Sequence, residues 1–229
     1  MPSRRDTPAT EVARDVSRRL RRWFARHGRD LPWRRTRDPY RILVSELMLQ
    51  QTQVSRVLDF YERFLARFPS LHDLAAARPA AVREQWEGLG YYARARNLHA
   101  LSRQVTRDGN GALPDDPQAL RNLPGIGPYT AGAVASFAFE RPAALVDTNV
   151  ARVIARIFAP RLRPKRARDL SRIWRIAESI LPRRGRTAWT HNQALMELGA
   201  LVCTARVRRC EVCPVASACA TRQRELRTR

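Results

Sequence analysis

Residues 123–132 read Leu-Pro-Gly-Ile-Gly-Pro-Tyr-Thr-Ala-Gly. Gly125 and Gly127 supply the backbone freedom that a tight turn between helices needs, and Pro128 fits the first position of the second helix. Such a turn exposes backbone N–H groups at a helix N-terminus, where a phosphate can bind. Turns of this composition also join helices in proteins that bind no phosphate, so the stretch alone leaves both interpretations open.

A second chemical feature is Val-Asp-Thr-Asn-Val at residues 146–150. Asp147 stands directly before an apolar run at helical spacing over residues 148–158, which is the position of an N-cap. The N–H groups and the dipole of such a helix stabilise an ionised carboxylate. Aspartate caps are common, but a phosphate-binding turn followed by one anchored anion is typical of a DNA-processing site.

The composition indicates a polyanionic partner. The 229 residues include 43 Lys or Arg and 21 Asp or Glu, which gives a formal net charge of +22, and Lys165 is the only lysine. Such a charge favours nucleic acid, whereas the lack of a long apolar segment argues against a membrane. The N-terminus lacks the apolar core of a signal peptide, so we expect a cytoplasmic monomer in a reducing compartment.

Apolar residues recur at helical spacing through the chain, and no stretch shows a sustained period of two. The sequence therefore predicts an all-α fold. The first helix, over 11–27, is expected to bury Val12 together with Val16 and Leu20. We expect two helical lobes, one of residues 30–141 with the hairpin, and one of residues 1–29 and 142–229 with the cysteines. The next helix is expected to begin at Pro39 and to reach residues 50–52 at or near its end. Later helices are expected near 54–65, 70–76, 79–86, 93–107, 117–122, 130–139, 148–158, 167–181 and 187–200.

The four cysteines of the chain lie close together, at Cys203, Cys210, Cys213 and Cys219. Such clustering favours a metal site over a disulfide framework. Four thiolates from one short loop suit either tetrahedral zinc or a [4Fe–4S] cluster. Zinc sites more often use two close pairs, and only one Cys-x2-Cys pair exists here. The spacing therefore favours iron–sulfur modestly and leaves zinc open.

Five blocks together resemble one family, the adenine DNA glycosylases of the MutY type. They are Leu-Pro-Trp-Arg (31–34), Ser-Glu-Leu-Met-Leu-Gln-Gln-Thr-Gln-Val (45–54), Gly-Leu-Gly-Tyr-Tyr-Ala-Arg-Ala-Arg-Asn-Leu-His (88–99), the hairpin (123–132) and Val-Asp-Thr-Asn-Val (146–150). That family belongs to the helix-hairpin-helix superfamily that includes endonuclease III. The resemblance implies a six-helix lobe, a [4Fe–4S] lobe and a DNA-binding cleft between them.

The resemblance also implies catalytic roles. Glu46 matches the general acid that protonates the departing adenine, and Asp147 matches the carboxylate that stabilises the sugar cation. Asn149 and Tyr129 match supporting residues of the pocket. This fits the chemistry, because cleavage of an N-glycoside needs an acid on the leaving base and an anion near the sugar. The apolar neighbours of Glu46 should raise its pKa, while Asp147 at a helix N-terminus should stay charged.

The DNA contacts that the resemblance implies come from separate blocks. Gln51 and Tyr91 match residues that enter the base stack when the nucleotide is swung out of the duplex. Gly125 and Gly127 match the hairpin glycines on the phosphate backbone, and Arg34 is assigned to DNA with the first block. The expected partner is double-stranded DNA that contains a mismatch or an oxidised base.

The position that carries a lysine in endonuclease III holds Tyr129 here. Strand cleavage through a Schiff base needs an amine, so we expect a monofunctional glycosylase that uses water. Two alternatives stay open: a thymine or uracil glycosylase acting on T·G or U·G mismatches, which Tyr129 also fits, and a non-catalytic DNA-binding module. Many relatives continue into a domain that reads 8-oxoguanine, and here ten residues follow Cys219. The sequence therefore leaves the opposite-base preference open.

Overall fold

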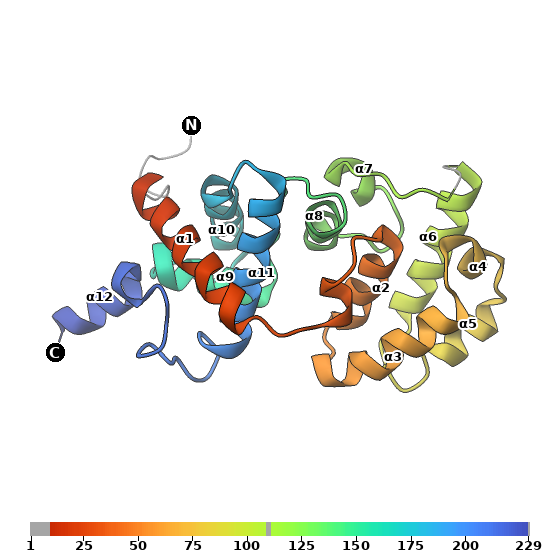
Figure 1. Ribbon diagram of the computed structural model, residues 1–229, viewed down its shortest axis with the longest axis horizontal. Helices are drawn as coiled ribbons and strands as arrows, with labels where there is room; N and C mark the ends of the chain where they lie inside the picture. The colour runs from red at the N-terminus through yellow and green to blue at the C-terminus, as the bar shows by residue number, and fades with distance from the viewer. Residues whose placement is uncertain (1–9, 109–110, 229) are drawn as a thin grey trace. The chain divides into compact units, whose positions relative to one another are not determined.

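The computed structural model describes residues 10–108 and 111–228, which form twelve α-helices and two 3₁₀ helices (Figure 1). Within these residues the one β-bridge is isolated and joins Cys203 to Arg208. The predicted all-α fold is confirmed. None of the described helices is both long enough and apolar enough to cross a membrane.

The chain divides into two compact units, and the first is continuous, Asp30–Phe139. It begins with the 3₁₀ helix η2 (Pro32–Arg34). Its α-helices are α2 (Pro39–Leu49), α3 (Val54–Arg67), α4 (Leu71–Ala76), α5 (Pro79–Gln85), α6 (Ala93–Asp108), α7 (Pro117–Arg121) and α8 (Pro128–Phe137). Every residue of α8 from Thr130 to Phe137 is buried. Because most of these residues are small or apolar, neighbouring helices can pack closely on α8, and these include α2 and α7.

The second unit is discontinuous and comprises the described parts of Met1–Arg29 and Glu140–Arg229. Its elements are α1 (Thr10–His27), α9 (Thr148–Phe158), α10 (Ala167–Ile180), α11 (Gly185–Leu201), η3 (Ala216–Ala218) and α12 (Ala220–Arg227). Glu197 of α11 is fully buried and accepts hydrogen bonds from the Arg29 side chain at 2.7 and 2.9 Å and from its backbone N–H. This pair ties the end of α1 to α11.

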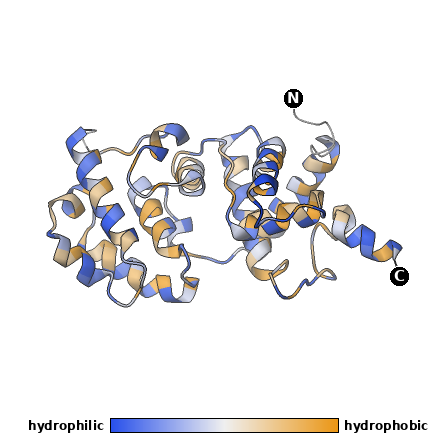
Figure 2. Ribbon diagram, turned by 180° about the vertical axis from the view of Figure 1, so that it is seen from behind, coloured by the Kyte–Doolittle hydropathy of each residue, from blue (hydrophilic) through white to orange (hydrophobic). Residues whose placement is uncertain are grey.

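Two details differ from the sequence-based expectation. Val12 is 41% exposed, because it lies in the first turn of α1 at the edge of the face that buries Ala13, Val16 and Leu20. The helix α12 has no counterpart among the predicted helices. It buries no residue and is largely hydrophilic (Figure 2), so its sequence has no apolar stripe from which a helix could be predicted.

Candidate active site and cysteine pocket

Glu46 lies in the interior of the first unit. Its helix α2 is capped by Asp38, which accepts the backbone N–H of Tyr40 at 2.8 Å, and Pro39 follows at the first helical position. Glu46 is 3% exposed although it is an acid, and the Tyr129 hydroxyl donates a hydrogen bond to its Oε2 at 2.8 Å. The structure therefore brings two predicted site residues together, 83 positions apart in the chain.

The start of α8 holds Tyr129 in that position. Gly127 is the N-cap residue of α8 and Pro128 begins the helix, so Tyr129 lies in the first turn. Its neighbour Thr130 accepts a hydrogen bond from the Gln50 amide at 3.3 Å. Two hydrogen bonds thus join the first turn of α8 to α2 and to the residue that follows it.

The hairpin glycines Gly125 and Gly127 differ in backbone conformation and in the space around them. Gly125 has φ +76°, and a Cβ at this position would lie 2.6 Å from the Asn97 Cβ, so this turn requires glycine for both conformation and space. Gly127 has φ −87°, an ordinary conformation, and a Cβ there would meet nothing within 4 Å. The prediction that both glycines serve backbone freedom is therefore wrong for Gly127. What Gly127 provides is an uncovered surface at the N-terminus of α8.

Gln51 and Tyr91 share an unusual backbone. Their φ values are +56° and +49°, in the left-handed region that favours glycine. Both residues are exposed, Tyr91 by 58%. Gln51 lies in a strained turn after α2, and Tyr91 lies in a strained turn before α6. Both present their side chains to solvent, and a residue that enters a base stack needs such exposure.

Arg94 contacts the turns that carry Gln51 and Tyr91, and the sequence analysis did not single it out. It is 7% exposed, and its guanidinium donates hydrogen bonds to the carbonyls of Met48 at 2.7 Å, Gln50 at 2.6 Å and Gly90 at 2.9 Å. It also lies 5.3 Å from the ring centroid of Tyr91. Burial lowers the pKa of Arg94. One side chain thus joins the turn at Gln51 to the turn at Tyr91.

A signal for Arg94 does exist in the sequence. The residue shares its helical face with Leu98, Leu101 and Val105, all of which are buried. An arginine in line with an apolar stripe must satisfy its donors internally, because a buried unpaired charge is costly.

Arg34, which was predicted to contact DNA, is half-buried at the end of η2, in the same unit as Glu46.

Asp147 caps α9 as the sequence predicts. Its Oδ1 accepts the backbone N–H of Val150 at 2.6 Å, and its Oδ2 accepts the side-chain amide N–H of Asn149 at 3.1 Å. Asn149 therefore orients the carboxylate from the first turn of the same helix. These two predicted site residues lie together in the second unit.

Two further arginines of α9 connect this cap to the cysteine loop, and neither was predicted. Arg152 donates to the Asn149 Oδ1 and to the Gly199 carbonyl, both at 2.8 Å, and to the Cys203 carbonyl at 3.0 Å. Arg156 lies 3.3 Å from the Cys203 sulfur. Burial and the nearby Arg156 lower the pKa of Arg152, while Cys203 and Asp147 oppose this change. A continuous set of hydrogen bonds therefore runs from Asp147 to the loop.

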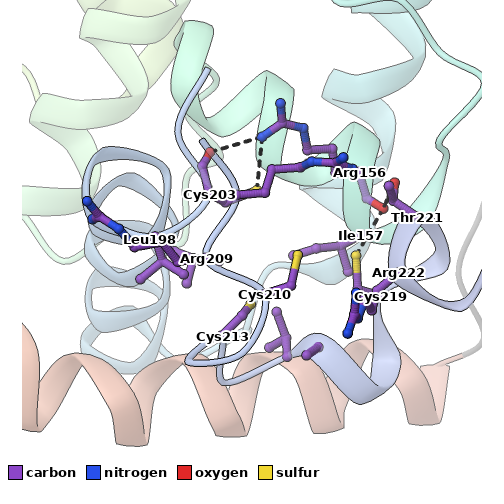
Figure 3. A pocket seen from close by; sticks show the side chains of 14 residues that line it. Arg156, Ile157, Leu198, Cys203, Arg209, Cys210, Cys213, Cys219, Thr221 and Arg222 are labelled. Carbon is purple, nitrogen blue, oxygen red and sulfur yellow. Dashed lines mark hydrogen bonds between the residues drawn. The ribbon is translucent and has the colours of Figure 1, made fainter. Parts of the chain in front are cut away.

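All four cysteines line one cavity, together with residues of α9 and α11 (Figure 3). None of them forms a disulfide. Burial raises the pKa of Cys213 to about 11 and also raises that of Cys219, and the other cysteines nearby add to both shifts. Four thiolates can therefore share this cavity only if a cationic centre compensates their charge.

The arrangement bears on which metal centre the cavity suits. The described residues contain no group of three His, Cys, Asp or Glu side chains that could hold one metal ion. A single tetrahedral zinc needs its thiolates close together, since each Zn–S bond is only about 2.3 Å long. A [4Fe–4S] cluster instead takes one cysteine at each of its separate irons. The donor set is four sulfurs that line one cavity, and four thiolates suit either centre.

The structure groups the predicted residues by unit. Glu46 is joined to Tyr129, Asp147 to Asn149, and the four cysteines share a pocket. The remaining predicted DNA contacts belong to the first unit, namely Arg34, Gln51, Tyr91, Gly125 and Gly127.

Comparison with known proteins gives a consistent result. Residues 44–176 match the family model described as HhH-GPD superfamily base excision DNA repair protein. The chain is 43% identical over 220 residues to the adenine DNA glycosylase of Mycobacterium tuberculosis, a match that covers 94% of this chain and 71% of the relative. It is 42% identical over 217 residues to the adenine DNA glycosylase of Rattus norvegicus, covering 90% of this chain. The chain spans 38–42% of the length of the mammalian relatives.

Solved structures with the same fold include a thermostable thymine-DNA glycosylase, with a TM-score of 0.85 and 30% sequence identity over 93% of this chain and 98% of that one. A trapped covalent intermediate of endonuclease III with DNA matches with a TM-score of 0.78 and 25% identity, covering 95% of this chain and 99% of that chain.

Proposed function

Because this chain belongs to the HhH-GPD superfamily of base excision DNA repair proteins, we propose that it is a monofunctional DNA N-glycosylase. Its substrate is adenine mispaired with 8-oxoguanine or guanine in double-stranded DNA. The observation that carries the proposal is the buried Glu46 hydrogen-bonded to Tyr129, in a chain 43% identical to an adenine DNA glycosylase.

The reaction breaks the bond between the sugar and the adenine and adds water to the sugar. Glu46 donates a proton to the base as the bonding electron pair leaves with it. Tyr129 donates a hydrogen bond to the Glu46 Oε2 and so holds the carboxyl group while it gives up its proton. Tyr129 is thus the positioning residue for the acid.

The sugar acquires positive charge as the base leaves, and we assign its stabilisation to Asp147. Two groups hold this carboxylate, the backbone N–H of Val150 and the side chain of Asn149. A carboxylate anchored in this way needs little reorganisation when the charge develops. Water then adds to the sugar and loses a proton, which passes to solvent, and the Glu46 carboxylate takes up a proton from solvent to restore the acid.

Access to the glycosidic bond requires the adenine to leave the base stack. We assign Gln51 and Tyr91 to the space it vacates, supported by their exposure and their strained turns. The uncovered N-terminus of α8 at Gly127 suits a backbone phosphate, and Arg34 adds a positive charge. The formal net charge of +22 supports the same partner.

We further propose that Cys203, Cys210, Cys213 and Cys219 hold a [4Fe–4S] cluster, supported by the pocket that they share. When bound, the cluster supplies a rigid crosslink of the loop that carries Arg206, Arg208 and Arg209. Purified protein should contain iron and acid-labile sulfide in equal amounts, and a Cys213→Ser variant should lose both. Zinc without sulfide would contradict this assignment.

The main experiment measures base release from duplexes with A opposite 8-oxoguanine, A·G, T·G and U·G. We expect the wild type to release adenine from the first two. Glu46→Gln should slow release by about 10²- to 10⁴-fold, the typical contribution of a general acid, and Asp147→Asn should also slow it strongly. Glu62→Gln and Asp59→Asn, matched changes at exposed positions of α3, should leave the rate unchanged.

A second candidate is a thymine or uracil glycosylase, because the chain shares 30% identity with the solved thymine-DNA glycosylase. Release of thymine or uracil without adenine would support that activity. Tight binding to every duplex with no release of any base would support a DNA-binding module without catalysis.

The proposal also excludes strand cleavage through a Schiff base. Tyr129 supplies no amine, and Lys165 is the only lysine of the chain. Borohydride added during turnover should trap no covalent complex with DNA. Efficient trapping would contradict the monofunctional assignment without affecting the glycosylase assignment.

A further inference from the structure

Another cavity lies in the second unit, away from the cysteines and from Asp147. Arg14, Ser17 and Arg21 of α1 line one side of it, and Arg183 and Thr187 line another, where the chain passes from α10 into α11. Its volume is about 530 Å³, whereas one water molecule occupies about 30 Å³. The cavity therefore has room for a ligand, and the proposed glycosylase mechanism uses none of these residues.

The charged residues that line this cavity all carry positive charge. Arg14, Arg21 and Arg183 contribute three guanidinium groups, and the described residues that line it include no acid. The nearby acid Asp15 is engaged elsewhere, since it accepts a hydrogen bond from Arg19 at 2.7 Å. An anion in this cavity would therefore lie among three positive charges, two of them on the exposed side chains of Arg14 and Arg183.

Two buried donors in the cavity wall have no partner in the structure. Ser17 is 5% exposed, and its Oγ makes no hydrogen bond. The buried Nε of Arg21 makes no hydrogen bond either. Other buried helix serines do not behave in this way: Ser45 and Ser102 each donate to the carbonyl three residues earlier, at 2.7 and 2.8 Å. The Ser17 hydroxyl has therefore not taken the usual local bond. Because Ser17 lines the cavity, a change of its side-chain rotamer would bring this buried hydroxyl to a group bound there.

We propose that this cavity binds a phosphate group. The Ser17 hydroxyl and the Arg21 Nε are its inner donors, and Arg14 and Arg183 supply charge at its walls. Guanidinium groups match phosphate oxygens in both charge and geometry. A phosphate would pair with the charges of Arg14 and Arg183 as well as with the two buried donors, whereas water carries no charge to pair with them.

The phosphate has two potential sources, a DNA backbone and a small phosphorylated molecule, and both present the same oxygens to the cavity. This site is separate from the hairpin at Gly125 and Gly127, which lies in the other unit. A phosphate bound at α1 therefore does not depend on the proposed glycosylase activity, and the two can be tested apart.

The test measures binding of inorganic phosphate by calorimetry, at constant ionic strength maintained with chloride. Arg183→Ala is compared with Arg184→Ala, because the two arginines are adjacent and exposed but only Arg183 lines the cavity. We expect Arg184→Ala to bind like the wild type and Arg183→Ala to bind on the order of tenfold more weakly. Ser17→Ala should weaken binding as well, while its thermal unfolding shows that it remains folded.

The source of the phosphate follows from duplex binding by the same variants. If Arg183→Ala weakens duplex binding more than Arg184→Ala and lowers the salt dependence by about one ion, the bound phosphate belongs to DNA. If the two variants bind the duplex equally, the site takes a small-molecule phosphate. The proposal is overturned if phosphate binds no better than chloride, or if Arg183→Ala and Arg184→Ala lose phosphate affinity equally.

Discussion

The carboxyl group of Glu46 is buried, and the proposed mechanism also requires it to transfer a proton. It lies among apolar residues of α2, and the Tyr129 hydroxyl donates to one of its two oxygens. A hydrogen bond to a charged group contributes about 1.5–3 kcal/mol. The Tyr129 hydroxyl therefore contributes to the orientation of the acid.

Removing that hydroxyl gives a direct prediction. Tyr129→Phe should slow adenine release by about ten- to a hundredfold, the loss expected for one hydrogen bond to a charged group, with duplex affinity nearly unchanged. Single-turnover kinetics measures the rate. Tyr40→Phe is the matched control, because the buried Tyr40 hydroxyl lies on the same helix but donates to the Phe68 carbonyl, at 2.8 Å. An equal loss of rate in both variants would show that Tyr129 acts through stability alone.

The backbone at Gln51 leads to a second prediction at this scale. A left-handed conformation strains a residue that has a Cβ, so Gln51→Gly should raise the free energy of unfolding by up to about 1 kcal/mol while slowing adenine release. Urea unfolding and single-turnover kinetics measure the two effects. Glu62→Gly, at an exposed position in the interior of α3, should instead lower stability. A Gln51→Gly variant that gains stability and keeps full activity would exclude Gln51 from the site.

Among the helices, α6 contacts its neighbouring segments through Arg94 in its first turn. Arg94 binds carbonyls at the end of α2 and in the turn before α6, so the positions of Gln51 and Tyr91 depend on one guanidinium. In the second unit, α9 carries Asp147 at its N-cap and Arg152 one turn later. In each case an arginine connects a turn that carries a site residue to a neighbouring segment.

The prediction for Arg94 follows from its partners. Arg94→Met should lower the free energy of unfolding by about 2–4 kcal/mol, because several buried carbonyls lose their donor, and hydrogen exchange should accelerate at residues 50–52 and 88–92. Arg96→Met, an exposed position on the same helix, is the matched control and should change neither. Unchanged exchange in Arg94→Met would mean that the two turns hold their conformation without it.

The charge of the whole chain sets how it meets DNA. Each phosphate contact releases counterions from the duplex, so binding by a chain of formal net charge +22 should weaken steeply with salt. We expect duplex affinity to fall on the order of a thousandfold between about 50 and 200 mM salt. Fluorescence anisotropy over this range measures it, and a nearly flat dependence would contradict phosphate-dominated binding.

Local signals were sufficient for much of this protein. The Asp38-Pro39 and Asp147 caps, the helical periodicity and the cysteine spacing all depend on residues close together in the chain, so the all-α fold and the candidate residues could be predicted. The resemblance to a known family added roles to Glu46 and Asp147, and those roles stay predictions.

Other features arise only when distant segments meet. The bond between Glu46 and Tyr129 spans 83 positions, and the arginine contacts of Arg94 with Gln50 span 44. Ser17, Arg21 and Arg183 share a cavity although α1 and the start of α11 lie far apart in sequence. Periodicity reports which face of a helix is buried, but not which partner the buried polar group finds there. The sequence by itself determined the helices, their caps and the cysteine cluster, whereas the pairing of buried charges and donors was decided by tertiary packing.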